Sequence, residues 1–197
     1  MDNKTLDFYN NNSKIYIEKT LSGDTTNLYN NFLKYVPKGG AILDLGCGSG
    51  RDSIEFIKRG YNLTAVDGSK EIANAASKII GQQVICSRFE ELKLNETFDG
   101  IWACASLLHI NKRYLINVIK NISSNLEDNG VFYMSFKYGK GEYIDEKGRY
   151  FNCYIEETFK EMILAVPKLE IIKIYKSEDT IDGRNNLQWL NVLLKIN

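Results

Sequence analysis

The sequence predicts an α/β protein built on one doubly wound, mostly parallel sheet that ends in an antiparallel hairpin. Short apolar runs typical of buried strands alternate along the chain with amphipathic runs typical of helices. Glycines and other turn residues separate these runs by short links, which favours a parallel sheet with helices on both faces. The chain of 197 residues is long enough for one such domain and too short for two. We therefore expect a single domain over residues 1–197.

Composition and charge narrow the classes of function. The formal net charge is zero, so no overall field favours nucleic acid or an anionic membrane as a partner. The four cysteines form no Cys-x-x-Cys pair and one histidine accompanies them, so neither a metal site nor a disulfide framework is expected. Cys86 and Cys104 are expected to be small core residues. The polar N-terminus and the lack of a run of roughly 18 apolar residues predict a cytoplasmic protein.

The N-terminal segment, residues 1–36, is expected to form a helical lid. Its first 20 residues are polar, with Tyr9 and Tyr16 among the few aromatic side chains. Two interpretations remain open for this part: a surface helix packed on the domain, or a lid that brings these tyrosines to a ligand. Residues 24–26 are typical of a helix N-cap, and the apolar spacing that follows predicts a second helical run that ends at Pro-Lys-Gly-Gly.

The middle of the chain predicts five strands with helices between them. The first strand leads into three glycines on alternate positions, and the second ends in an acid followed by a Gly-Ser turn. Amphipathic runs follow the first, second and fourth strands, and a loop or single helical turn at residues 89–92 follows the third. The expected strands are residues 41–45, 61–67, 83–86, 98–103 and 131–136, the last preceded by a turn at residues 128–130.

The pattern changes after the fifth strand. Residues 137–155 are polar, punctuated by glycines and rich in Tyr, Lys and Arg, so we expect a loop on the substrate side of the sheet. Trp189, near the C-terminus, is expected to lie in the core. The remaining elements are a helix over about residues 156–165 and an edge hairpin of residues 168–177 and 187–196, joined by residues 178–186.

The turn that contains Gly46, Gly48 and Gly50 predicts a ligand site, because backbone N–H groups and a helix N-terminus meet at such a strand end. A dinucleotide would require Gly-x-Gly-x-x-Gly, but Arg51 stands where the last glycine belongs, and a phosphate-binding P-loop is absent. S-adenosylmethionine carries no phosphate, and its ribose diol, ammonium and sulfonium groups suit acids and carbonyls. Asp67, at the end of the second strand, is placed to accept both ribose hydroxyls.

The motif Leu-Asp-Leu-Gly-Cys-Gly-Ser-Gly at residues 43–50, with Ala-Val-Asp-Gly-Ser at residues 65–69, resembles class I S-adenosylmethionine-dependent methyltransferases. Residues 98–102 and 129–132 resemble later motifs of this family, so the resemblance covers about residues 6–136. It implies a seven-stranded Rossmann-like sheet whose last two strands form the hairpin. Two stretches, Gly-Ser-Gly-Arg-Asp-Ser and Trp-Ala-Cys-Ala-Ser-Leu-Leu-His, are similar to the small bacterial tellurite-resistance-type branch. The Asn/Asp-Pro-Pro-Tyr/Phe motif of many DNA and protein methylases is absent.

The expected cofactor is S-adenosyl-L-methionine, with S-adenosyl-L-homocysteine as its product, and the expected partner is a small-molecule acceptor. Cationic and aromatic groups together suit an anionic, partly planar acceptor. The residues expected to bind the cofactor are Tyr16, Asp44, Gly46, Cys47, Gly48, Arg51, Asp52, Asp67, Gly68, Ser69, Phe89, Glu90, Ala103 and Ser106. The residues expected to contact the acceptor are Tyr9, Lys137, Tyr138, Arg149 and Tyr154.

Two further assignments have alternatives. His109, the only histidine, follows the fourth strand, and an imidazole has the pKa of a base near neutral pH, so it is the candidate catalytic base. The alternative is a structural residue that packs at the start of the next helix. Arg51 and Asp52 open the helix after the glycine turn, where Arg51 either pairs with its neighbour or reaches the carboxylate of the ligand.

Three other functions remain open at this point. An RNA or protein methyltransferase would carry a basic stripe beside the methyl pocket. A non-catalytic, cofactor-binding regulatory protein would keep the glycine turn and fill its acceptor cavity with side chains. A dinucleotide oxidoreductase would bind NADH instead of S-adenosylmethionine, although Arg51 argues against it.

Overall fold

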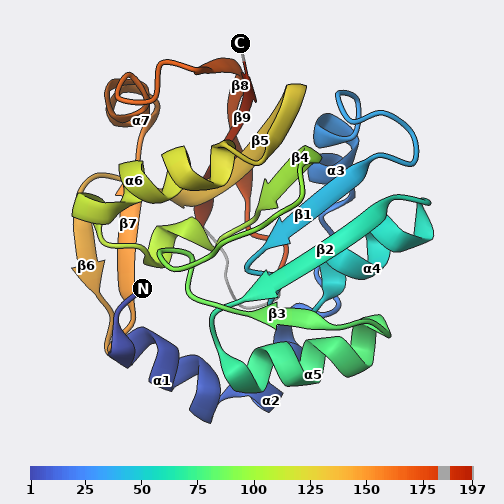
Figure 1. Cartoon of the computed structure of the whole chain (residues 1–197). Coiled ribbons are helices and arrows are strands. Elements are labelled where there is room, and N and C mark those ends of the chain that lie inside the picture. The colour runs from blue at the N-terminus through green and yellow to red at the C-terminus, as the bar shows by residue number, and fades with distance from the viewer. Residues whose placement is uncertain (182–186, 197) are drawn as a thin grey trace.

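Five parallel strands form the centre of the sheet, in the order β3-β2-β1-β4-β5 (Figure 1). The computed structural model describes residues 1–181 and 187–196. β1 pairs with β2 and β4, and the outer strands continue the same parallel pattern. The five expected strands are therefore confirmed. Their bounds are β1 (Ala41–Leu45), β2 (Asn62–Asp67), β3 (Val84–Cys86), β4 (Phe98–Ala103) and β5 (Leu126–Tyr138).

β5 is longer than expected because it begins before the predicted turn. Phe98 of β4 pairs with Leu126, whereas Gly100 pairs with Val131, so the residues between form a bulge on β5. Asn129, inside this bulge, has a φ of 67°. The turn residues that the sequence places at 128–130 thus lie within one bent strand.

The expected C-terminal hairpin is confirmed. β8 (Leu169–Glu178) and β9 (Gln188–Ile196) pair in antiparallel fashion, and β9 also pairs with β5, so the hairpin extends the parallel sheet beyond β5. Of the connection predicted at residues 178–186, residues 182–186 lie outside the described part of the chain.

The segment 137–155 is more regular than the predicted loop. It contains β6 (Glu142–Ile144) and β7 (Tyr150–Tyr154), which pair as a short antiparallel hairpin. β7 also runs parallel to the last two residues of β5, Lys137 and Tyr138. The sheet therefore has nine strands within the described residues, the seven that the resemblance implies plus this hairpin. β6 and β7 stand at the carboxyl end of β5, beside the ends of the other parallel strands (Figure 1).

Helices cover both faces of the sheet, as expected for a doubly wound fold. Val131 and Tyr133 of β5 pack with Phe32 and Phe56 on one face, and Phe132 packs toward the other. The first face is covered by α3 (Thr26–Phe32) and α4 (Arg51–Lys58), with α5 (Lys70–Ile80) against β2 and β3. The second face is covered by α6 (Lys112–Ser123) and α7 (Glu156–Ile163). No helix in residues 1–181 or 187–196 is long and apolar enough to cross a membrane.

The N-terminal segment divides into two parts. α1 (Asn3–Asn11) and α2 (Ser13–Thr20) lie against α5, next to the carboxyl ends of the strands (Figure 1). α3 instead contributes Tyr29 and Phe32 to the core. A lid role thus stays a prediction for α1 and α2, and α3 is part of the packed domain.

The prediction for the cysteines is wrong in part. Cys86 is exposed at the end of the edge strand β3, because a three-residue strand at the sheet edge leaves its last residue outside the core. Cys104, just after β4, is half-buried and lines a cavity, described below.

Candidate functional site

The glycine turn after β1 is held against β2 by its backbone. Gly46 and Cys47 both donate their N–H groups to the Val66 carbonyl, at 2.8 and 3.0 Å. Gly46, Gly48 and Gly50 all have positive φ angles, of 84°, 55° and 79°, a region that other residues rarely adopt. Gly50 is the N-cap of α4, so the turn ends directly in a helix N-terminus.

Asp67, the last residue of β2, is fixed beside this turn. Its Oδ2 atom accepts the N–H of Gly48 at 3.0 Å, and its Oδ1 atom accepts the N–H of Ser69 at 2.9 Å. Burial raises the pKa of Asp67 to about 6, although these backbone hydrogen bonds favour the charged form. The carboxylate lines a hollow and is charged at neutral pH.

This hollow, which we call the small hollow, has a volume of about 30 Å³ and lies between Asp67 and the ring of Phe89. Leu6 of α1 and Ile72 of α5 add apolar walls. A Cβ atom at Gly46 would lie 2.4 Å from the Cβ of Ser106 and 3.1 Å from the ring of Phe89. Glycine at this position therefore lets the turn, the ring and the serine approach one another.

A second space, which we call the large cavity, has a volume of about 350 Å³ and extends from the glycine turn to β9. Its walls come from α1, α2, the ends of β4 and β5, β7, and the hairpin β8–β9. Two tyrosines, two turn glycines and two residues that follow β4 line both spaces, so the small hollow and the large cavity adjoin. These shared residues are Tyr9, Tyr16, Gly46, Gly48, Ala105 and His109.

Tyr16 lies directly above the glycine turn. A Cβ atom at Gly48 would lie 3.1 Å from the Tyr16 hydroxyl oxygen, so the space between α2 and the turn exists because residue 48 has no side chain. From α1, Asn10 Oδ1 accepts a hydrogen bond from Ser69 Oγ at 2.7 Å. The first two helices therefore contact the wall of the small hollow at two places.

Asp52 is a buried carboxylate with three donors. Arg51 Nε lies 2.6 Å from its Oδ1 atom, which also accepts the Tyr29 hydroxyl at 2.7 Å, while Trp102 Nε1 donates to Oδ2 at 2.7 Å. Burial alone would raise the pKa of Asp52, but Arg51 and the hydrogen bonds lower it below its usual range. The pairing of Arg51 with its neighbour is thus part of a larger network, and both residues also line the large cavity.

Asp44, predicted to bind the cofactor, lies away from both spaces. It is buried beneath the turn, accepts the Ser53 hydroxyl at 2.6 Å, and lines neither space. Burial and the nearby Asp52 raise the pKa of Asp44 well above its usual range. Its place in the structure is that of a support below the turn.

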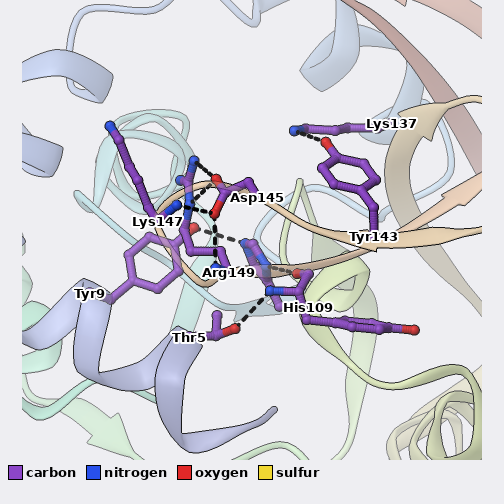
Figure 2. Close-up of polar contacts among 9 residues, drawn as sticks. Thr5, Tyr9, His109, Lys137, Tyr143, Asp145, Lys147 and Arg149 are labelled. Carbon is purple, nitrogen blue, oxygen red and sulfur yellow. Dashed lines mark hydrogen bonds and ion pairs between the residues drawn. The ribbon is translucent and has the colours of Figure 1, made fainter.

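His109 lies at the junction of the two spaces, in the short 3₁₀ helix Leu107–His109. Its Nδ1 atom lies 2.7 Å from the Tyr150 carbonyl, which can only accept, and its Nε2 atom lies 2.8 Å from the Tyr9 hydroxyl (Figure 2). Burial, with the nearby cations Arg149 and Lys137, lowers the pKa of His109 to about 4. The expected pKa near neutrality is therefore wrong, since the ring is enclosed and faces positive charge.

A cationic and aromatic wall bounds the large cavity next to His109. The Lys137 ammonium lies 3.6 Å from the centre of the Phe151 ring and donates to the Tyr143 hydroxyl at 2.6 Å. Arg149 lies 5.1 Å from the same ring, and its guanidinium binds Asp145 through Nε and Nη2 at 2.9 and 2.7 Å (Figure 2). Lys137 of β5 and Arg149, which precedes β7, are thus brought to one place by the hairpin that the sequence pattern missed.

The backbone after β4 is strained where it meets both spaces. Ala105 has a φ of 52°, and its N–H donates to Ser135 Oγ of β5 at 2.8 Å. The next residue, Ser106, donates its hydroxyl to the Leu45 carbonyl at 2.6 Å. These bonds hold the chain of residues 104–106 between the ends of β1 and β5.

Five of the residues predicted for the site line neither space. Glu90 is exposed and its carboxylate pairs with the Met1 ammonium. Tyr154 is buried among core aromatics, and Tyr138 packs under Lys176. Ala103 is fully buried within β4, and Asp44 lies under the turn as described. Strand alternation explains Tyr154, which points into the core while Phe151 reaches the cavity.

The structure also adds residues that the sequence reasoning left out. Thr20 and Leu28 reach the large cavity from the helical segment, and Trp189 and Asn191 reach it from β9. Trp189, expected in the core, packs against the core and lines the cavity as well. Ser135 could have been predicted from the sequence as a site residue, since it is a polar residue near the carboxyl end of an otherwise apolar strand.

Known proteins resemble this chain in sequence and in fold. Residues 42–130 match the family model described as "Methyltransferase domain". The Ubiquinone biosynthesis O-methyltransferase of Rickettsia canadensis is 31% identical over 91 residues, which cover 43% of this chain and 39% of that protein. The chain therefore spans well under half the length of this curated relative.

Two solved structures share the fold at low sequence identity. The 1,6-didemethyltoxoflavin-N1-methyltransferase of Burkholderia thailandensis, solved with 1,6-didemethyltoxoflavin and S-adenosylhomocysteine, has a TM-score of 0.76 at 18% identity and covers 98% of this chain and 85% of its own. An S-adenosylmethionine-dependent methyltransferase of Clostridium acetobutylicum has a TM-score of 0.66 at 19% identity. The match covers 100% of this chain and 93% of the Clostridium chain.

The chain has the Rossmann-like fold of these solved structures, with the glycine turn at the carboxyl end of β1. Together with the family match over residues 42–130, the fold and the turn confirm the resemblance to S-adenosylmethionine-dependent methyltransferases, whose cofactor is S-adenosyl-L-methionine. The tellurite-resistance-type branch is not distinguished by these matches and stays a prediction.

Proposed function

We propose that this chain transfers a methyl group from S-adenosyl-L-methionine to a small-molecule acceptor. The observation that carries the proposal is the junction of two spaces at the glycine turn. The small hollow contains Asp67, the large cavity contains the cationic wall, and Tyr9, Tyr16 and His109 line both. A cofactor that spans the turn would place its reactive end at this junction.

The donor set around the turn fits this cofactor. Asp67 and Asp52 present carboxylates to the two spaces, which suits a ribose diol and the positive ammonium and sulfonium groups and opposes a phosphate. Phe89, Leu6 and Ile72 provide apolar surface for an adenine. Gly48 leaves open the space below Tyr16 that a side chain would fill. Arg51 offers a cation near the turn for the carboxylate of the methionine part.

When bound, the cofactor supplies an electrophilic methyl group on a sulfonium. The residues of the chain then have three tasks: Asp67 holds the ribose, the glycine turn and Tyr16 enclose the methionine part, and the walls of the large cavity orient the acceptor. Positioning of this kind can supply much of the rate of a displacement reaction. His109 has too low a pKa to act as an efficient base at neutral pH, which favours a positioning role through Tyr9.

The size of the large cavity supports a small-molecule acceptor. A volume of about 350 Å³ lies within the range of small-molecule sites. The alternative of a non-catalytic binding protein predicts an acceptor space filled by side chains, which this open cavity disfavours. The Rickettsia relatives, named as ubiquinone biosynthesis enzymes, support a small acceptor too. A cytoplasmic location and the lid role of α1 and α2 remain part of the proposal.

Calorimetry tests the cofactor half of this proposal. We expect S-adenosylmethionine and S-adenosylhomocysteine to bind the full chain, and the Asp67→Ala variant to lose most of this affinity. NADH is the control for the oxidoreductase alternative. Binding of NADH without binding of S-adenosylmethionine would overturn the proposal.

A further inference from the structure

We propose that Ser135 is a positioning residue for methyl transfer, because its hydroxyl holds the strained backbone of Ala105 in place where the small hollow adjoins the large cavity. This inference rests on the proposed function, since it concerns the wall between the cofactor and the acceptor. It follows from a backbone conformation that alanine rarely adopts, from the hydrogen bonds on either side of it, and from a buried serine in an apolar strand.

Ala105 has a backbone conformation that its own side chain does not favour. In the described part of the chain, Ala105 and Asn129 are the two non-glycine residues with positive φ angles, of 52° and 67°. Asparagine tolerates this left-handed region because its side chain can form local hydrogen bonds, whereas the methyl group of alanine makes the region costly. The surroundings must therefore hold Ala105 in this conformation.

Hydrogen bonds hold the backbone on both sides of Ala105. On the acceptor side, the Ala105 N–H donates to Ser135 Oγ at 2.8 Å. On the cofactor side, Ser106 Oγ donates to the Leu45 carbonyl at 2.6 Å, and the Ser106 carbonyl accepts the His109 N–H at 3.2 Å. Of the two spaces, Ser135 lines the large cavity and Ser106 lines the small hollow, while Ala105 lines both. Each space therefore has its own anchor for this segment.

Ser135 supplies an acceptor where the pairing of β4 with β5 ends. The last paired residues are Ala103 and Met134, so the N–H of Ala105 lies beyond the ladder and needs another partner. Ser135 is only 2% exposed, and the other residues of the run 131–136 are apolar or aromatic. A buried hydroxyl is costly unless it is hydrogen-bonded. The bond to Ala105 therefore accounts for a serine at this place in the strand.

The position of Ala105 explains how this bond acts on the reaction. The contact with the glycine turn is tight, since a Cβ atom at Gly46 would lie 2.4 Å from the Cβ of Ser106. Without the Ser135 hydroxyl, Ala105 is free to relax to a negative φ, which moves its part of the wall while Ser106 stays anchored. Because the alignment of the reacting groups sets the rate of a displacement, the rate should fall although the cofactor still binds.

Label transfer tests this role in the reaction. The full chain is given S-adenosylmethionine labelled on its methyl group and a metabolite extract, and the initial rate of labelling of small molecules is measured. We expect Ser135→Ala to lower this rate about tenfold, the scale of one lost hydrogen bond, and to change the affinity for S-adenosylhomocysteine less than about threefold. Adding Ala105→Gly to Ser135→Ala should restore most of the rate, because glycine adopts a positive φ without strain.

Asn129→Gly is the matched control for this rescue. It also places a glycine at a positive φ, but in the bulge of β5, and residue 129 lines neither space. It should not restore the rate of Ser135→Ala. A serine that acts by touching the acceptor directly would lose the same rate with or without Ala105→Gly, and that result would overturn the inference. An unchanged rate in Ser135→Ala would overturn it as well.

The backbone of residue 105 can be observed independently of activity. NMR chemical shifts of the isotope-labelled full chain report the sign of φ, which we expect to be positive in the wild type and negative in Ser135→Ala. A positive φ retained in Ser135→Ala would show that Ser135 does not hold Ala105. No labelling of small molecules by the wild type would instead count against the proposed function, and the chemical shifts would still decide whether Ser135 holds this backbone.

Discussion

The Tyr9 hydroxyl donates a hydrogen bond to His109 Nε2 across 2.8 Å, and His109 Nδ1 donates to the Tyr150 carbonyl across 2.7 Å. Since a carbonyl can only accept, Nδ1 must carry the proton of the neutral ring, and Nε2 must accept from Tyr9. The two bonds connect α1, the segment after β4, and β7. Both ring nitrogens of His109 are therefore engaged, so the imidazole offers no free lone pair at the junction of the two spaces.

The first prediction is that His109 stays neutral at physiological pH. Burial lowers its pKa to about 4, so the folded chain should show its histidine resonance titrating near that pH, with the Nδ1–H tautomer above it. The chain has one histidine, so the NMR signal is unambiguous. In urea the same signal should titrate near about 6.5. A midpoint near 6.5 in the folded protein would contradict this.

The lowered pKa of His109 also determines how the stability of the protein changes at acid pH. The folded pKa of His109 is lower than the unfolded one, so the ring contributes stability that is complete above about pH 6.5 and is lost as the pH falls toward 4. A His109→Phe variant should therefore lose less stability than the wild type between pH 6.5 and 4.5, as measured by urea unfolding at each pH.

The second prediction concerns the pH dependence of cofactor binding. The pKa of Asp67 is raised to about 6 by burial, and ribose hydroxyls donate to its charged form. Affinity for S-adenosylmethionine should therefore rise between pH 5 and pH 7. In Asp67→Ala the affinity should fall about 100-fold, the scale of two hydrogen bonds to a charged group, and the rise should vanish. Asp128→Ala, at an exposed acid, is the calorimetric control.

The third prediction separates backbone strain from loss of space at the turn. Gly48→Ala places a Cβ at a φ of 55° and 3.1 Å from the Tyr16 hydroxyl oxygen. Gly60→Ala suffers the same kind of strain, at a φ of 84°, but meets nothing within 4 Å. Both variants should lose about 1 kcal/mol of stability. Gly48→Ala alone should also lose about tenfold in affinity for S-adenosylhomocysteine; equal affinities for the two variants would contradict the assignment.

The fourth prediction concerns the buried ion pair. Arg51→Met leaves the Asp52 carboxylate with the Tyr29 and Trp102 donors but without a cation, and should cost about 3 kcal/mol of stability. The matched control is Arg59→Met, which breaks the exposed pair with Glu55 and should cost about 0.5 kcal/mol or less. Urea unfolding at pH 7 measures both. Similar losses for the two variants would show that the Asp52 network does not depend on its cation.

Much of the fold was predictable because local patterns decide it. The apolar strands, the glycine turn and the acid that ends β2 are read directly from residues 41–67, and the structure places them as expected. The hairpin β6–β7 was missed because its pairing with β5 depends on residues far from it in sequence, and because its strands are short and polar.

The candidate site was harder to predict, because burial and distant partners set its chemistry. Nothing in the pattern around Asp44 indicates that it is enclosed and has a raised pKa, and nothing around Asp52 indicates that Tyr29 and Trp102 donate to it. The expectation of a neutral-range pKa for His109 failed for the same reason: its enclosing groups come from residues 9, 137, 149 and 150. Spacing along the chain identifies which residues face a strand edge, but not the environment that tunes them.

Methyl transfer itself is the central claim, and isotope transfer tests it most directly. The full chain is incubated with S-adenosylmethionine labelled on its methyl group and a metabolite extract, and Asp67→Ala serves as the control. The account predicts labelled small molecules, with little or no label in the control. Label in macromolecules, or equal labelling by Asp67→Ala, would contradict it.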